Sequence, residues 1–185
     1  LKTIGDWAFN SCSSITRIDL PNSLESIGGH AFYDCSNLSY ITLGDSLKTI
    51  GDWAFNGCNS LNTVNIPKAD IHFSDNSFAY EGNPFSKAST LHVNGEEVTE
   101  LVIPDGVEEL RKDFFYNFGK NVTSATIANS VKNIRNNTFE NWTNLSQITL
   151  SDSLKTIGTY AFYGCSALTR IDLPNSLESI AGYAF

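Results

Sequence analysis

LKTIGDWAF opens the chain at residues 1–9, SLKTIGDWAF follows at 46–55, and SLKTIGTYAF returns at 153–162. Two explanations compete for this repetition: a binding or catalytic motif used several times, or a structural unit that stacks on copies of itself. Alignment on the motif divides the sequence into units that start at Leu1, Leu24, Leu47, Asp70, Val107, Val131, Leu154 and Leu177. The step is 23 residues where the pattern is clean, and a fixed period of this length is the signature of a repeat architecture.

The apolar positions inside a unit predict its local structure. Position 9 is phenylalanine in every copy: Phe9, Phe32, Phe55, Phe78, Phe115, Phe139, Phe162 and Phe185. Apolar residues at positions 18 and 20 alternate with polar ones at 17 and 19, as in ITRIDL and LSQITL, which is the pattern of a strand with one buried face. LKTI and LESI predict a second short extended segment, and GDWAF predicts a tight helical turn. One unit buries too little apolar surface to fold alone, so the sequence predicts stacked coils.

The pattern L-x-x-I-x-x-x-A-F-x-x-C-x-x-L-x-x-I-x-I-P resembles the BspA-type leucine-rich repeat, which is found in bacterial and protist surface proteins. The match is tight at 1–69 and 131–185 and looser at 107–130. The resemblance implies an α/β repeat solenoid, a right-handed horseshoe with a parallel concave sheet and short strands or helical turns on the convex side. We expect 1–185 to form one solenoid of about seven and a half units, cut from a longer protein because the chain begins and ends inside the motif. Open sheet edges predict end-to-end association.

The composition excludes several kinds of partner. The net charge is −8 at pH 7 and the acidic residues are scattered, whereas nucleic acids and anionic membranes require clustered Lys and Arg. No apolar run is long enough to span a bilayer, which argues against membrane insertion.

The cysteines all occupy position 12 of their units: Cys12, Cys35, Cys58 and Cys165. Other units carry Phe118 or Trp142 in that position, so it is a buried apolar slot. The 23-residue spacing also lacks the C-x-x-C pairing of zinc sites. We therefore predict buried free thiols and no metal.

The histidines, His30, His72 and His92, stand beside no recognisable nucleophile motif. A glycine-rich phosphate loop is also missing from the sequence. We predict no catalytic residue and no cofactor.

The outward positions 17 and 19 vary down the stack while the buried positions do not. They are the candidate ligand-binding face: Arg17, Asp19, Tyr40, Thr42, Thr63, Asn65, Glu100, Val102, Ser124, Thr126, Gln147, Thr149, Arg170 and Asp172. Exposed faces of solenoids commonly bind ligands. The alternative is a solvated polar face rich in Thr, with Arg17/Asp19 and Arg170/Asp172 as ion pairs that contribute little.

The segment 70–97 is longer than a clean unit. Its Asn94–Gly95 pair lies between extended flanks and predicts a hairpin. Insertions in solenoids map to loops, so Tyr80 and Phe85 are candidate loop contacts. Alternatively, the hairpin packs against the solenoid and covers an irregular layer.

Two functions are compatible with these features. The resemblance implies a non-enzymatic cell-surface or secreted module that adheres to a host or extracellular-matrix protein, or to a glycan. The alternative is a structural spacer or stalk within a larger surface protein or secreted enzyme.

Overall fold

The computed structural model describes residues 1–67, 83–112 and 117–185. The chain divides into two compact units. Among the described residues, unit 1 holds 1–67 and 83–97, and unit 2 holds 98–112 and 117–185. The expectation of a single solenoid over 1–185 stays a prediction.

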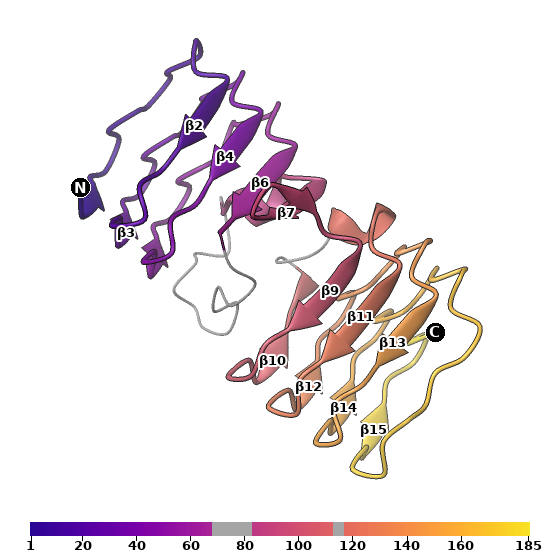
Figure 1. The fold of residues 1–185 in the computed structure, drawn as a ribbon. Helices are drawn as coiled ribbons and strands as arrows, with labels where there is room; N and C mark the ends of the chain where they lie inside the picture. The colour runs from indigo at the N-terminus through magenta and orange to yellow at the C-terminus, as the bar shows by residue number, and fades with distance from the viewer. Residues whose placement is uncertain (68–82, 113–116) are drawn as a thin grey trace. The chain divides into compact units, whose positions relative to one another are not determined.

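Apart from one antiparallel hairpin, unit 1 consists of short parallel strands that stack one coil upon the next (Figure 1). Its main sheet has the order β2-β4-β6-β7-β8. The strands are β2 (Arg17–Asp19), β4 (Tyr40–Thr42), β6 (Thr63–Ile66), β7 (Thr90–Val93) and β8 (Glu96–Glu97). Its minor sheet contains β1 (Thr3–Ile4), β3 (Ser26–Ile27) and β5 (Thr49–Ile50) in that order.

Unit 2 repeats this arrangement with its own two parallel sheets (Figure 1). The main sheet contains β9 (Glu100–Ile103), β11 (Ser124–Ile127) and β13 (Gln147–Thr149) in that order. The minor sheet contains β10 (Glu109–Leu110), β12 (Asn133–Ile134), β14 (Thr156–Ile157) and β15 (Ser179–Ile180). Stacked parallel coils are thus confirmed in both units.

The helical elements that lie wholly within the described residues are two single 3-10 turns, η1 (Pro84–Ser86) and η2 (Phe118–Lys120). The α/β part of the predicted class is therefore not confirmed. The backbone of the GDWAF segment gives the reason: Trp7 and Trp53 both have φ of 61°, in the left-handed region. A right-handed helix cannot pass through such a residue, so the segment forms a turn.

The core is a set of like side chains in register. Ile18 pairs with Ile41 and Ile41 with Val64 across the main sheet of unit 1. The position-9 phenylalanines stack coil on coil, with ring centroids 5.0 Å apart for both Phe9–Phe32 and Phe32–Phe55.

The same stack recurs in unit 2. Phe139 and Phe162 lie 5.2 Å apart, and Phe162 and Phe185 lie 5.4 Å apart, with the last ring half exposed. Phe78 and Phe115 lie outside the described residues. Offset-stacked rings of this kind contribute beyond the apolar area that they bury.

The thiols form a second internal ladder. Each buried Sγ donates to the carbonyl of the phenylalanine one coil earlier: Cys35 to Phe9 at 3.0 Å, Cys58 to Phe32 at 3.1 Å and Cys165 to Phe139 at 3.1 Å. The prediction of burial is confirmed for these three cysteines, whereas Cys12 is half-buried. Burial raises the pKa of Cys58 to about 12 and that of Cys165 to about 11, so these thiols stay protonated at neutral pH.

Trp142 takes the cysteine slot in the coil that starts at Val131, and the coil before it provides the space. Its side chain is buried beside Gly119, where a Cβ would lie only 2.1 Å from the indole Cδ1. A glycine is therefore required opposite the tryptophan, since any side chain there would overlap it.

The hairpin prediction is confirmed. β7 and β8 are antiparallel, and the turn between them contains Asn94 with φ of 53° and Gly95 with φ of 84°. Two successive residues with positive φ match the twist of the flanking strands, which is why Asn-Gly favours this turn.

Candidate binding face

The main sheet of unit 1 presents positions 17 and 19 outward, as the alternation predicts. Arg17, Tyr40 and Thr63 are register partners, and so are Asp19, Thr42 and Asn65. These six side chains are exposed or half-exposed, whereas Ile41 and Val64 between them are buried.

The next pair of outward residues differs from the expectation. β7 pairs in parallel with β6, which places Thr90 beside Thr63 and His92 beside Asn65. Thr90 and His92 therefore extend this face, and Glu100 does not follow Thr63. The signal was in the sequence: TLHV alternates in the same way as ITRID, but the Asn-Gly turn after it indicated only an antiparallel partner.

An aromatic and ionic cluster lies at the β2–β4 end of the face. Arg17 donates to Asp19 through Nε at 2.9 Å, and its guanidinium carbon lies 4.1 Å from the centroid of the Tyr40 ring. Asp19 also accepts a hydrogen bond from Thr42 Oγ1 at 2.6 Å. The Arg17 contact, followed by that of Thr42, lowers the pKa of Asp19, so the pair is charged at neutral pH.

Hydrogen bonds continue this cluster toward the hairpin. Asn65 Nδ2 donates to Thr42 Oγ1 at 3.5 Å, and the backbone N–H of Gly95 donates to Asn65 Oδ1 at 2.9 Å. The Tyr40 ring meets His92 edge-on, with centroids 6.2 Å apart. One connected set of polar contacts thus runs from β2 to the β7–β8 turn.

The main sheet of unit 2 carries a face of the same kind. Its outward residues fall into two columns, which are Glu100, Ser124 and Gln147 beside Val102, Thr126 and Thr149. Val102 is an apolar side chain that is 55% exposed on this face. The surface offers hydroxyl and amide groups for hydrogen bonding around one apolar contact.

The last predicted pair lies outside strand pairing. Arg170 and Asp172 follow the coil that contains β13, but no described backbone bond joins them to that strand. Their ion pair is formed, with Arg170 Nη2 2.9 Å from Asp172 Oδ1, and both side chains are about 80% exposed. Such an exposed pair contributes little to stability.

Phe85, one of the two candidate loop contacts, is not on this face. Phe85 lies in η1 and is fully buried, so it belongs to the core of unit 1 and cannot serve as a loop contact. Its turn is capped by Asn83, whose Oδ1 accepts from the backbone of Ser86 at 2.8 Å. Tyr80 lies outside the described residues.

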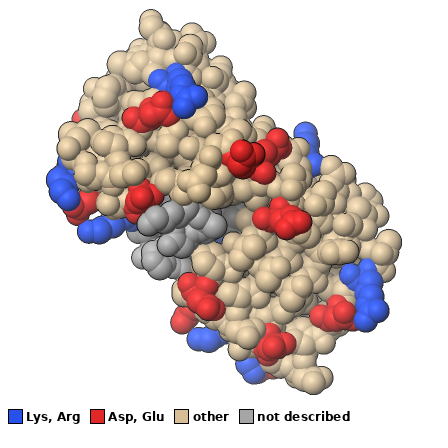
Figure 2. Space-filling model, viewed as in Figure 1, with Lys and Arg blue, Asp and Glu red and all other residues tan. Residues whose placement is uncertain are grey.

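Charged groups on the visible side of the molecule are few and of both signs. Figure 2 shows acidic and basic side chains in small groups separated by uncharged surface. On this side, the charges do not form the continuous positive patch that a nucleic-acid backbone requires. Among the described residues, moreover, no helix has the length and hydrophobicity of a transmembrane span.

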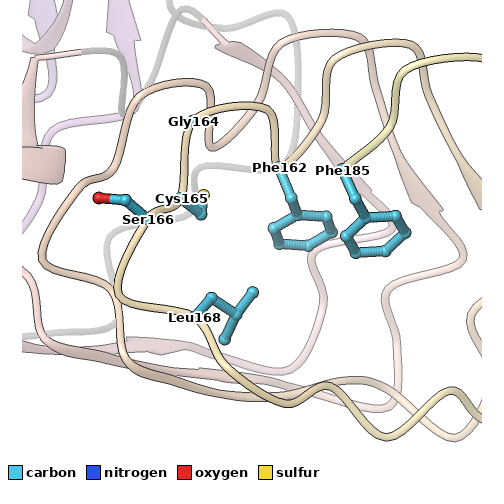
Figure 3. Close-up of a pocket in the computed structure, with 6 residues that line it drawn as sticks. All are labelled: Phe162, Gly164, Cys165, Ser166, Leu168 and Phe185. Atoms are coloured by element: carbon cyan, nitrogen blue, oxygen red, sulfur yellow. The ribbon is translucent and has the colours of Figure 1, made fainter.

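A hollow of about 230 Å³ opens at the last coil of unit 2 (Figure 3). It is lined by Phe162, Gly164, Cys165, Ser166, Leu168 and Phe185. The two phenylalanine rings lie parallel on one side, and the lining is mostly apolar. Since the thiol is held protonated by burial and none of the six residues is a base, the lining supplies no acid–base pair.

Stacked parallel coils with an apolar ladder inside and a variable polar face outside define a solenoid repeat protein of the leucine-rich class. The model of the BspA type leucine rich repeat region matches residues 1–87 and 88–185, with six copies of the repeat. The chain belongs to this family, and the matching model describes a repeat region, not a catalytic domain.

Solved structures of bacterial leucine-rich repeat proteins resemble the chain. The T. pallidum leucine rich repeat protein TpLRR is 26% identical over 91% of this chain and 72% of its own, with a TM-score of 0.50. The pneumococcal vaccine antigen PcpA is 26% identical over 97% of this chain and 50% of its own, with a TM-score of 0.49. A leucine rich cell surface protein from Faecalibacterium prausnitzii is 21% identical over 100% and 74%, with a TM-score of 0.47. A search of curated proteins found no match.

Proposed function

We propose that the outward faces of the two main sheets bind a protein ligand, and that the chain is a non-catalytic adhesion module at the cell surface or outside the cell. The observation that carries this proposal is the connected set of contacts from Arg17 to Gly95. It holds polar side chains in fixed positions before any ligand arrives, which reduces the entropy that binding costs. The occurrence of BspA-type repeats in surface proteins supports the location.

The proposal is tested with charge reversals on the face. The variant Arg17→Glu/Glu100→Lys/Arg170→Glu changes three exposed side chains: two in the outward columns, and Arg170 of the last predicted pair. We expect it to lose binding to an array of purified extracellular-matrix proteins by about tenfold or more, because charge reversal at an interface opposes the partner's complementary groups.

The matched control reverses three charges that directly precede strands of the minor sheets, as Lys48→Glu/Lys132→Glu/Glu178→Lys. This variant should bind like the unchanged chain. If neither variant alters binding, or if the unchanged chain binds no protein on the array, the face is not the ligand site and a spacer role is favoured.

A further inference from the structure

A second exposed surface lies on the turns of unit 1, away from the outward columns of the main sheet. Position 7 of three successive coils carries Trp7, His30 and Trp53, and their rings stack with centroids 4.0 Å and 6.5 Å apart. Tyr33 leans against this stack, 5.4 Å from His30 and tilted by 41°. Trp7 is 53% exposed and Trp53 40% exposed, so the cluster presents a substantial aromatic surface to solvent.

The backbone does not require aromatic residues there. Position 7 has φ of 61° at Trp7 and Trp53 and 57° at His30, in a region that is costly for a bulky side chain. In unit 2, Asn137 fills this position in one coil with φ of 61°, and Tyr160 and Tyr183 fill it in two others. Asparagine is one of the residues that tolerate such a φ best. Aromatic rings at this strained position therefore point to a role for the side chains.

Exposed carboxylates flank the rings. Asp6 precedes Trp7, Asp52 precedes Trp53, and Asp34 follows Tyr33 in the sequence. Backbone hydrogen bonds between coils hold these segments side by side: the N–H of His30 donates to the Asp52 carbonyl at 2.9 Å. Within the part of the chain that the structure describes, no Lys or Arg forms an ion pair with any of the three carboxylates.

The main sheet of unit 1 shows which group an aromatic ring and a carboxylate can bind together. There, one aromatic ring and one carboxylate together bind a guanidinium: Arg17 lies 4.1 Å from the Tyr40 centroid while it donates to Asp19. Arginine suits such a site because its planar head stacks on rings and pairs with carboxylates, and its stem covers apolar surface. The turn cluster has the ring and the carboxylate but not the cation.

We propose that the cluster of Trp7, His30, Tyr33 and Trp53, with Asp6, Asp34 and Asp52, binds an arginine-bearing segment of a partner protein. The guanidinium groups lie against the aromatic surface and donate hydrogen bonds to the carboxylates.

Unit 2 provides an internal comparison. It has an aromatic turn cluster too, in which Tyr160 stacks on Tyr183 at 5.4 Å and meets Tyr163 edge-on. No aspartate or glutamate stands next to these tyrosines in the sequence. The Val131 coil has Asn136 and Asn141 at the positions of Asp6 and Asp34, and its Glu140 is already engaged by Lys112 at 3.4 Å. We therefore expect an arginine-bearing ligand to bind the turn cluster of unit 1 more tightly than that of unit 2.

The three tryptophans make the test specific. A ¹⁵N-labelled chain is titrated with hexa-arginine, and the indole N–H signals are followed by NMR. We expect the signals of Trp7 and Trp53 to shift, while that of the buried Trp142 stays in place. Hexa-glutamate, the charge-reversed control, should shift none of them.

Two variants separate this site from general attraction to an acidic protein. The first variant, Trp7→Asn/Trp53→Asn, introduces the residue that stands at position 7 in the coil of Asn137. The second, Asp6→Asn/Asp34→Asn/Asp52→Asn, removes the three charges but keeps a side-chain oxygen that can accept hydrogen bonds. Each variant should weaken hexa-arginine binding by about tenfold. The matched control, Glu97→Gln/Asp105→Asn/Asp152→Asn, removes the same charge from exposed positions elsewhere and should change binding less than about twofold. Circular dichroism checks that each variant is folded.

Three results would overturn the proposal. The first is equal loss of binding in the control and the aspartate variant, which would mean that hexa-arginine responds only to net charge. The second is binding that survives in the folded tryptophan variant. The third is a titration in which cellohexaose, a neutral oligosaccharide, shifts the Trp7 and Trp53 signals and hexa-arginine does not, which would assign the cluster to a glycan.

Discussion

Units 1 and 2 have nearly the same interior and different surfaces. Their phenylalanine stacks are spaced at 5.0 Å and 5.2 Å, and their thiols donate to equivalent carbonyls. Outside, unit 1 joins a hairpin to its main sheet and has carboxylates next to its turn aromatics in the sequence, and unit 2 does neither among its described residues. A buried side chain must fit a copy of itself one coil away, whereas an outward side chain meets water, so only the second is free to diverge.

The largest loss of stability is expected when the phenylalanine stack of the shared interior is broken. Phe32→Ala removes a fully buried ring held between Phe9 and Phe55, and we expect a loss of about 3–5 kcal/mol in the free energy of unfolding. Phe185→Ala, at a ring that is half exposed, should cost less than about 1.5 kcal/mol. Denaturant unfolding followed by circular dichroism measures both, and similar losses would refute the view that stacking inside the coil sets stability.

A smaller effect is expected where unit 2 departs from the shared interior. Gly119→Ala places a methyl group against Trp142 and should cost about 1–3 kcal/mol. Trp142→Cys restores the residue that other coils carry, so it should relieve much of this cost. A double-mutant cycle tests the coupling; strictly additive losses would show that the glycine and the tryptophan do not compensate each other.

The thiol ladder predicts a difference in reactivity among the cysteines. Iodoacetamide at pH 8 should alkylate half-buried Cys12 about tenfold faster than Cys35, Cys58 or Cys165, because only the thiolate reacts and burial raises the pKa of the latter three. Mass spectrometry of the native chain measures this, and the denatured chain, in which all four should react alike, is the control. Uniform labelling of the native chain would contradict it.

The raised pKa of Cys58 also has a consequence for stability. The contribution of the buried Cys58 thiol to the free energy of unfolding is fully present below the ordinary pKa of 9.0. It is lost as the pH rises toward about 12, because the thiol ionises at a lower pH in the unfolded chain than in the folded one. Cys58→Ala should therefore flatten the alkaline side of the stability profile.

The smallest expected effect concerns the surface charges that directly precede the strands of the minor sheets. Glu25 in unit 1 contacts both Lys2 and Lys48, and these two ammonium groups lower its pKa to about 2. Because the pKa is lowered, the contribution of the Glu25 carboxylate to stability is complete above the ordinary pKa of 4.5 and is lost as the pH falls toward about 2. Glu178 in unit 2 forms its ion pair with Lys155.

Thermal unfolding at pH 6 and at pH 2.5 compares the two acids. Glu25→Gln should lower the Tm at pH 6 slightly and by less at pH 2.5, and Glu178→Gln should change it less than Glu25→Gln at either pH. Both effects are small because the pairs are exposed. A Glu25→Gln loss that grows as the pH falls would contradict the assignment.

Several features of the candidate site could be read from the sequence because they depend only on neighbouring residues or on the period. The outward columns, the Arg17–Asp19 pair and the Asn94–Gly95 turn are examples. The parallel pairing of β7 with β6 could not be predicted, because the sequence of a four-residue strand does not specify which neighbouring strand it pairs with. For that reason Thr90 and His92 were missed.

Phe85 was assigned to a loop contact for a related reason. An aromatic residue in an irregular segment has no periodic neighbours, so its burial depends on which part of the solenoid that segment covers. The prediction of a helical turn in GDWAF was wrong for another reason. Ala-Phe pairs are compatible with a helix, but the path of the chain to the next strand requires a positive φ at position 7.

By itself, the sequence determined the repeat, the in-out alternation and the identity of the core, because a 23-residue period leaves each buried side chain facing its own kind. Only the tertiary structure decided which outward residues become neighbours: His92 beside Asn65, and Trp7 beside His30. The physical reason is that inward positions are constrained by one repeating contact, whereas the neighbours of an outward side chain depend on how strands from distant coils are paired and how each turn is bent.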